Sequence, residues 1–202
     1  MCIRDSNIDE AYLTVDRHSA NDFMPYIYRT RDGGKAWTKI TSGIPDAEIA
    51  RVVKEDPVRA GLLYAGTEHG AWVSFDDGDR WESLQLNLPT ASVRDLIVHG
   101  DDLVIGTYGR AFWILDDVTP LRQISAEASS ADAYLYKPAT TIRVRNDTDF
   151  DTPFPPEITH GDNPPDGAIL NYYLKLSLIH ICSWAHLRSA LSRVHGRTRR
   201  RR

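Results

Sequence analysis

The stretch VSFDDGDRW, residues 73–81, is a strand-like run that ends in two aspartates, a glycine and a tryptophan. YRTRDGGKAW, residues 28–37, has the same skeleton. Four positions match at a constant distance of 44 residues: Thr30 with Ser74, Asp32 with Asp76, Gly34 with Gly78 and Trp37 with Trp81. A repeat of this length indicates an array of similar structural units rather than a single irregular domain.

The sequence around this repeat is typical of short β-strands separated by Gly, Pro, Asp and Asn. We predict strands at residues 11–16, 26–30, 37–40, 49–54, 62–67, 71–75, 81–86, 93–98, 102–107 and 111–115. Residues 62–77 also align with residues 103–117, which places Gly66-Thr67 on Gly106-Thr107, 40 residues later. Four strands per unit of about 40–50 residues predict an all-β fold, a partial β-propeller of two to three blades.

The repeated residues have a structural interpretation. Ser or Thr and Asp have short side chains that accept hydrogen bonds from the main-chain N–H groups of a turn. Gly permits a positive φ, and Trp at the start of the outer strand covers apolar surface. We therefore predict a structural role in the turn between the third and fourth strands of a blade for Thr30, Asp32, Gly34, Trp37, Ser74, Asp76, Gly78 and Trp81.

The pattern S/T-x-D-x-G-x-x-W resembles the Asp box of the BNR repeat, which occurs in sialidases, sortilin-like proteins and several glycoside hydrolases. Over about residues 7–175, including YAGTEHGAWVSFDDGDRW and IGTYGRAFWILDD, the chain resembles large bacterial sortilin-like BNR-repeat proteins that are often labelled glycosyl hydrolases. The resemblance implies an extracellular or periplasmic protein in which the blades precede an Ig-like module. It implies propeller blades at 7–117 and the first strand of a truncated Ig-like module in DGAILNYYLK, 166–175.

The third unit departs from the pattern, because Asp116-Asp117 is followed by VTPLRQ, with neither the Gly nor the Trp. We interpret residues 118–165 as a connector that ends in a Pro/Asp-rich linker, with one candidate strand at 138–145. An open arc of blades exposes apolar sides that a closed ring would cover.

Both ends of the chain differ from the rest. Residues 1–6, MCIRDS, and 176–202 resemble translated sequencing-adapter sequence of metagenomic reading frames, and we interpret both as foreign. The alternative is a basic helical tail that binds an anionic partner. The only two cysteines, Cys2 and Cys182, lie in these segments, so the sequence predicts no disulfide framework and no thiolate metal site in the body.

Charge and hydropathy exclude two classes of partner. Seven of the 24 Lys and Arg residues lie in 188–202, so residues 1–187 carry 17 basic against 28 acidic side chains, a net charge of −11. Nucleic-acid binding needs clustered basic residues, so none is expected. No apolar run approaches the roughly 20 residues of a membrane span.

Strand parity places the turns between second and third strands on the opposite end of each blade from the repeated turns. These second-to-third turns contain the candidate ligand-face residues Glu68, His69, Tyr108 and Arg110. Glu68 is a candidate acid or a solvated carboxylate, and His69 a candidate base or an ordinary surface histidine. Tyr108 and Arg110 are candidates for gripping a sugar or a carboxylate, although Arg110 could equally pair with Asp116 or Asp117.

Glycoside hydrolysis usually needs two carboxylates across one bond, and the sequence presents no complete catalytic set. We therefore predict no catalytic residue, cofactor or metal ligand in this chain. The primary hypothesis is a non-catalytic scaffold that binds a glycan, a peptide or a protein and packs against the remaining blades of its propeller. The alternatives are part of a sialidase-like glycoside hydrolase whose catalytic residues lie mostly on other blades, and a purely structural array.

Overall fold

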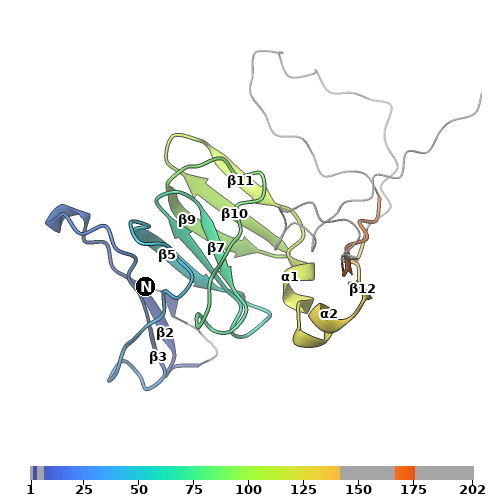
Figure 1. Ribbon diagram of the computed structural model, residues 1–202, viewed down its shortest axis with the longest axis horizontal. Helices are drawn as coiled ribbons and strands as arrows, with labels where there is room; N and C mark the ends of the chain where they lie inside the picture. The colour runs from blue at the N-terminus through green and yellow to red at the C-terminus, as the bar shows by residue number, and fades with distance from the viewer. Residues whose placement is uncertain (1, 4–6, 142–166, 176–202) are drawn as a thin grey trace, which may run out of the picture. The chain divides into compact units, whose positions relative to one another are not determined.

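The computed structural model of the chain describes residues 2–3, 7–141 and 167–175. It divides into two compact units, Met1–Ile124 and Ser125–Arg202. Residues 142–165 of the predicted connector and the predicted foreign tail, 176–202, lie outside the described residues. The first unit contains the predicted blades and consists mainly of β-strands joined by short turns (Figure 1).

Three antiparallel sheets make up the first unit. The first blade comprises β1 (Cys2–Ile3), β2 (Ala11–Thr14), β3 (Ile27–Thr30) and β4 (Thr38–Lys39), with the short helix η1 (His18–Ala20) between β2 and β3. The second blade comprises β5 (Ala50–Glu55), β6 (Leu63–Thr67), β7 (Ala71–Ser74) and β8 (Glu82–Ser83). The third blade comprises β9 (Val93–His99), β10 (Asp102–Thr107) and β11 (Phe112–Leu115).

Within each sheet the spatial order of the strands follows the chain, and every pair of neighbours is antiparallel. The blades also follow one another in chain order, since β5 packs against β2 of the first blade and β9 of the third. Up-and-down sheets that pack side by side in this way form a partial β-propeller, as predicted. β1 falls within residues 1–6, which we had interpreted as foreign, and it pairs with β2 at Cys2–Tyr12 and Ile3–Ala11.

The outer strands are shorter than predicted. β4 covers Thr38–Lys39 instead of residues 37–40, and β8 covers Glu82–Ser83 instead of 81–86. The predicted end of this outer strand, Leu86, adopts a φ of 42°, a left-handed value that a strand does not accommodate. The other predicted strands are present, one of them with the predicted bounds (β10) and the rest with ends shifted by at most two residues.

Apolar side chains fill the spaces between blades. Between the first and second blades, Tyr12 and Ile27 of one pack with Leu63, Ala65 and Trp81 of the other. Between the second and third blades the core contains Leu62, Tyr64, Ala71, Val73, Val93, Leu96, Leu103 and Ile105. The second sheet therefore buries residues on both of its faces, which is why its strands show continuous apolar runs as well as alternation.

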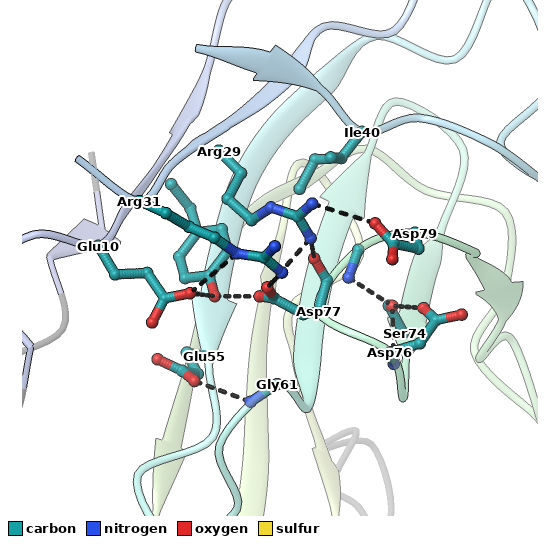
Figure 2. Close-up of polar contacts among 12 residues, drawn as sticks. Glu10, Arg29, Arg31, Ile40, Glu55, Gly61, Ser74, Asp76, Asp77 and Asp79 are labelled. Atoms are coloured by element: carbon teal, nitrogen blue, oxygen red, sulfur yellow. Dashed lines mark hydrogen bonds and ion pairs between the residues drawn. The ribbon is translucent and has the colours of Figure 1, made fainter. Parts of the chain in front are cut away.

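A polar cluster crosses the boundary between the first two blades (Figure 2). The buried Arg29 of β3 donates from Nη1 to Asp77 Oδ2 at 3.0 Å and lies 3.1 Å from Asp79 through Nη2. The exposed Arg31 also binds Asp77, and the hydroxyl of Tyr12 donates to the same carboxylate. Burial and the bond to Asp77 raise the pKa of Tyr12, so the hydroxyl keeps its proton and remains a donor.

The third blade ends differently from the other two. Asp117 has a φ of 60°, which matches Gly33 at 69° and Asp77 at 61° in the corresponding turns. The chain then enters the helix α1 (Thr119–Gln123), with Pro120 in its first turn. Leu121 joins the apolar core, and Arg122 donates from Nε to both oxygens of the buried Asp56 at 3.0 Å. The first compact unit thus extends past residue 117, where we placed the end of the blades.

The described part of the second unit contains α2 (Ala126–Ser130), β12 (Ala133–Leu135) and β13 (Tyr172–Leu174). Ser125 caps α2, since its side chain accepts a hydrogen bond from the N–H of Ala128. β13 lies within the predicted Ig-like segment, and it pairs antiparallel with β12, which belongs to the predicted connector. Residues 138–141 of the candidate strand at 138–145 are not in a strand.

Candidate functional site

The first repeated turn, Thr30–Trp37, is held by its own side chains. The Thr30 hydroxyl donates to Asp32 Oδ1 at 2.8 Å and accepts the N–H of Gly34 at 3.0 Å. Asp32 Oδ1 also accepts the N–H of Ala36 at 2.9 Å. The bonds from Ala36 and Thr30 lower the pKa of Asp32 below its usual range. This carboxylate therefore stabilises the turn.

The second repeated turn, Ser74–Trp81, reproduces the same contacts. Ser74 donates to Asp76 Oδ1 at 2.8 Å and accepts the N–H of Gly78 at 2.9 Å, and Asp76 Oδ1 accepts the N–H of Arg80 at 2.8 Å. Equal geometry in two blades supports the structural interpretation of the repeated residues. Asp32 and Asp76 are engaged by their turns and are not available as a catalytic pair.

The two tryptophans of the repeat have different environments. Trp81 is 2% exposed and packs on the first blade, where its Nε1–H donates to the main-chain oxygen of Ile40 at 2.8 Å. Trp37 is 40% exposed. Trp81 therefore covers apolar surface of the preceding blade, as expected. The described residues place no blade against Trp37, so for Trp37 the expectation stays a prediction.

The predicted ligand face contains a polar network, a connected set of hydrogen bonds and ion pairs that involves all three blades. Arg51 of β5 donates to Glu68 Oε2 from Nε at 2.9 Å and from Nη2 at 2.6 Å, and it also binds Asp16, next to the first blade's β2. Ser92, which precedes β9, donates to the same Glu68 oxygen at 3.0 Å. The guanidinium of Arg51 thus links carboxylates of the first two blades. The hydrogen bond from Ser92 extends this polar network to the third blade.

These contacts determine the protonation state of Glu68. Partial burial alone would raise its pKa, but the hydrogen bonds from Arg51 and Ser92 and the charge of Arg51 outweigh it and lower the pKa below the usual range. A general acid in glycoside hydrolysis needs a raised pKa in order to hold its proton near neutral pH. Glu68 is therefore an ionised anchor, and the expectation of a freely solvated carboxylate is also wrong.

Tyr108 and Arg110 lie in the corresponding turn of the third blade. Tyr108 is 73% exposed, and the guanidinium of Arg94 lies 5.0 Å from its ring centroid. Arg110 is exposed, and its main-chain oxygen accepts Trp113 Nε1–H at 2.8 Å. Asp117 Oδ1 accepts hydrogen bonds from the main-chain N–H and the hydroxyl of Thr119, at 3.1 and 2.5 Å. The turn and the adjacent β9 therefore present an aromatic ring and two guanidinium groups.

Two histidines lie beside carboxylates at this polar network. His69 Nδ1 lies 3.1 Å from Glu48 Oε1, and His18 Nδ1 lies 2.7 Å from Asp16 Oδ1. His69 is half-exposed and has a carboxylate neighbour, so it is more than the isolated surface histidine of the sequence interpretation. The described residues contain no group of three or more His, Cys, Asp or Glu side chains positioned to hold a metal ion. None of their helices is long and apolar enough to cross a membrane.

The sequence identified Glu68, His69, Tyr108 and Arg110 from the position of their turns, and the structure places Glu68 and the Tyr108 turn at the ends of neighbouring blades. It did not single out Asp16, Arg51, Ser92 or Arg94. Arg51 and Arg94 are each the second residue of the first strand of a blade, β5 and β9. The recurrence of an arginine near the start of the first strand in two successive blades was the signal that could have identified these two residues.

No protein-family model and no curated protein matches the chain. Among solved structures, the chain is similar to a GH74 enzyme of Niastella koreensis, with 18% identity, a TM-score of 0.46 and coverage of 57% of this chain and 20% of that one. It is similar to a GH74 xyloglucanase from Xanthomonas campestris, with 12% identity, a TM-score of 0.44 and coverage of 68% and 24%. A third similar structure, YCF48 bound to D1 peptide, has 21% identity, a TM-score of 0.35 and coverage of 46% and 30%. The chain spans less than a third of each.

Proposed function

We propose that this chain belongs to an extracellular or periplasmic propeller that binds a glycan or a peptide on its ligand face without turning it over. The observation that carries the proposal is the double engagement of Glu68. Arg51 and Ser92 occupy its Oε2 atom and keep the group ionised. The carboxylate therefore orders the face and does not deliver a proton.

The exposed part of the face supplies the binding groups. Tyr108 offers a flat apolar ring, and Arg94 and Arg110 offer guanidinium groups that can form paired hydrogen bonds with a carboxylate. Arg51, by contrast, has only a 12% exposed side chain and is already bound to Asp16 and Glu68. The proposed ligand is therefore a glycan or an extended peptide that carries an acidic group next to a ring or an apolar side chain.

The test is a screen of the chain against a glycan array and a library of acidic peptides, followed by calorimetry on the ligand that binds. Tyr108→Ala and Arg94→Gln should each weaken binding by about tenfold or more, since truncating a central aromatic or arginine anchor typically costs more than about 1 kcal/mol. Arg80→Gln is the matched control, because Arg80 is exposed in a repeated turn at the other end of the blade.

The glycoside hydrolase alternative has a separate readout. Release of reducing sugar from a bound glycan, abolished by Glu68→Gln while binding persists, would replace the scaffold proposal with an enzymatic one. Equal affinity of the parent and the Tyr108→Ala variant would remove this turn from the site.

A further inference from the structure

The strand registers show which residues of the ligand face occupy the same place in successive blades. The second and third strands of each blade make their last register pair at a matching position: Thr14–Ile27, Gly66–Ala71 and Gly106–Phe112. The residue two positions further along the chain lies in the connection to the third strand, and it is Asp16, Glu68 and Tyr108 in successive blades. We name this place the acidic position of the repeat, because two of its three residues are carboxylates.

The main chain supports the equivalence of Glu68 and Tyr108. The N–H of Glu68 donates to the main-chain oxygen of Ile49 at 3.0 Å, and the N–H of Tyr108 donates to that of Ser92 at 2.8 Å. Ile49 and Ser92 each immediately precede the first strand of their blade. The same hydrogen bond therefore holds the acidic position in both blades, while the side chain changes from a carboxylate to a phenol.

Arg51 and Arg94 also occupy one place in the repeat, and in both blades this place is a β-bulge. The pairing of β5 with β6 skips Arg51, and the pairing of β9 with β10 skips Arg94. A bulge leaves one extra residue out of the ladder and changes the direction of its side chain, and bulges are frequent next to binding sites. The same local backbone geometry thus presents both arginines.

Arg51 shows what this arginine binds where the acidic position holds an acid. It contacts the carboxylate of the preceding blade, Asp16, and the carboxylate of its own blade, Glu68. Its Nε and Nη2 atoms both donate to Glu68 Oε2, at 2.9 and 2.6 Å. Because the Arg51 side chain is only 12% exposed, water screens these contacts little. The second blade therefore contains a complete example of carboxylate recognition.

Arg94 lacks such a partner, although the structure describes both blades that could supply one. The acidic position of its own blade holds Tyr108, whose ring centroid lies 5.0 Å from the Arg94 guanidinium. The acid of the preceding blade, Glu68, is bound by Arg51 and accepts the Ser92 hydroxyl at 3.0 Å. Within the part of the chain that the structure describes, none of the ion pairs involves Arg94. This exposed guanidinium is therefore open to a carboxylate from another molecule.

The electrostatics of Glu68 show that Arg94 lies close to the polar network. Partial burial raises the pKa of Glu68, whereas hydrogen bonds from Arg51 and Ser92, followed by the charges of Arg51 and Arg94, lower it below the usual range. Arg51 already has two carboxylate partners, so its positive charge is compensated within the chain. An incoming anion is therefore attracted by Arg94 and not by Arg51.

We propose that Arg94 and Tyr108 bind an aspartate or glutamate side chain of a peptide, whose carboxylate occupies against Arg94 the place that Glu68 occupies against Arg51. This inference rests on the proposed function and adds the chemical group that the ligand face selects. Both carboxylates on Arg51 belong to side chains with one or two methylene groups. The second blade is thus a template for an acidic side chain and not for a sugar acid, whose carboxylate is attached directly to its ring.

The test titrates the full chain with a minimal probe, N-acetyl-glutamate N-methylamide, at constant ionic strength and follows the arginine Nε–H signals by NMR. A single charge-assisted contact at an exposed site binds weakly, so we expect the Arg94 signal to shift at roughly 10 mM probe. N-acetyl-glutamine N-methylamide has nearly the same shape without the charge and should cause no shift. The Arg51 signal is the internal control, because its Nε–H is bound to Glu68 and should not respond.

Two substitutions of Tyr108 isolate the charge at the acidic position. Tyr108→Glu gives the third blade the carboxylate that the other two blades carry, so Arg94 should be bound within the chain and its response to the probe should be lost. Tyr108→Gln introduces a side chain of the same size without the charge, and the Arg94 response should persist. Unchanged far-UV circular dichroism establishes that both variants are folded.

Several results would overturn this inference. They are an Arg94 signal that does not shift in the parent chain, an equal shift with the glutamine probe, and equal responses of the two Tyr108 variants. A methyl glucuronide that shifts the Arg94 signal at a lower concentration than the glutamate probe would assign the place to an acidic sugar instead of a peptide. The proposed function has a separate outcome: a ligand whose binding Tyr108→Ala weakens would support it even where the glutamate probe causes no shift.

Discussion

Trp81 donates its indole N–H to the main-chain oxygen of Ile40 at 2.8 Å and is almost completely buried against the first blade. The same residue also donates its main-chain N–H to Ser42 at 2.8 Å. A residue that sequence analysis assigns to a turn therefore joins two blades through its side chain and its backbone. The repeat thus determines the contact between blades as well as the turn within one.

Trp81→Ala should lower the free energy of unfolding by about 3–5 kcal/mol, because it removes a large buried side chain and leaves a cavity. Trp37→Ala is the matched substitution in the same motif, and it should change stability by less than about 1 kcal/mol because Trp37 is 40% exposed. Urea unfolding followed by circular dichroism measures both, at a concentration at which the chain is monomeric. An equal decrease in the free energy of unfolding for the two variants would contradict the difference in burial between Trp81 and Trp37.

Arg29→Met should destabilise the chain by about 3 kcal/mol or more, because it leaves Asp77 partly buried without its buried cationic partner. Arg31→Met should change stability by less than about 1 kcal/mol, since the Arg31 side chain is 59% exposed and its ion pair is screened by water. The two arginines bind the same carboxylate, but Arg29 is buried and also binds Asp79 and the main-chain oxygen of Asp77, so the comparison sets a buried arginine with several partners against an exposed one. A larger effect for Arg31 would show that the exposed contact dominates.

Gly66→Ala should destabilise the boundary between the second and third blades by about 1–3 kcal/mol, because the new methyl group overlaps Val93. Gly106→Ala occupies the same repeat position in the third blade, where the nearest atom lies 3.5 Å from the new Cβ. In the monomeric chain this variant should match the parent or exceed it by up to about 1 kcal/mol. Thermal unfolding of the pair distinguishes a covered glycine from an open one.

We expect the free energy of unfolding to decrease at acidic pH, in part because Glu68 becomes protonated. Its pKa is lower in the folded chain than in the unfolded one, so its stabilising contribution is present above the ordinary pKa of Glu and is lost as pH falls through the lower, folded-state pKa. Unfolding in urea at about pH 7 and about pH 3 measures the difference, which Glu68→Gln should reduce. Asp46→Asn, an exposed control in a loop of the same face, should leave the difference unchanged. Asp16 responds in the same direction, so the reduction is partial.

Much of the fold could be predicted because its signals are local and recur. The turns of Thr30 and Ser74 form from residues within eight positions of one another, and both make the predicted hydrogen bonds. The lengths of the outer strands were predicted less accurately, because a strand of two residues is too short to show an alternating pattern. The helix after Asp117 was missed because five residues are too few to show a helical period.

The sequence predicted only some residues of the candidate site. Chain order placed Glu68 and Tyr108 in turns at one end of their blades. The partners of Glu68, Arg51 and Ser92, lie 17 and 24 positions away on a strand and in a loop, and no spacing in the sequence shows that they meet Glu68. Their pairing lowers the pKa of Glu68 and changes a candidate acid into an ionised anchor.

The sequence by itself determined the repeat, the strands and the chemistry of the turns, since each depends on residues close together in the chain. Only the tertiary structure decided how blades meet: that Arg51 joins Asp16 to Glu68, and that Arg29 and Arg31 share Asp77. Trp37 and Trp81 occupy the same place in the same motif, yet one is exposed and the other buried. Burial depends on what packs against a residue, and that neighbour belongs to another blade.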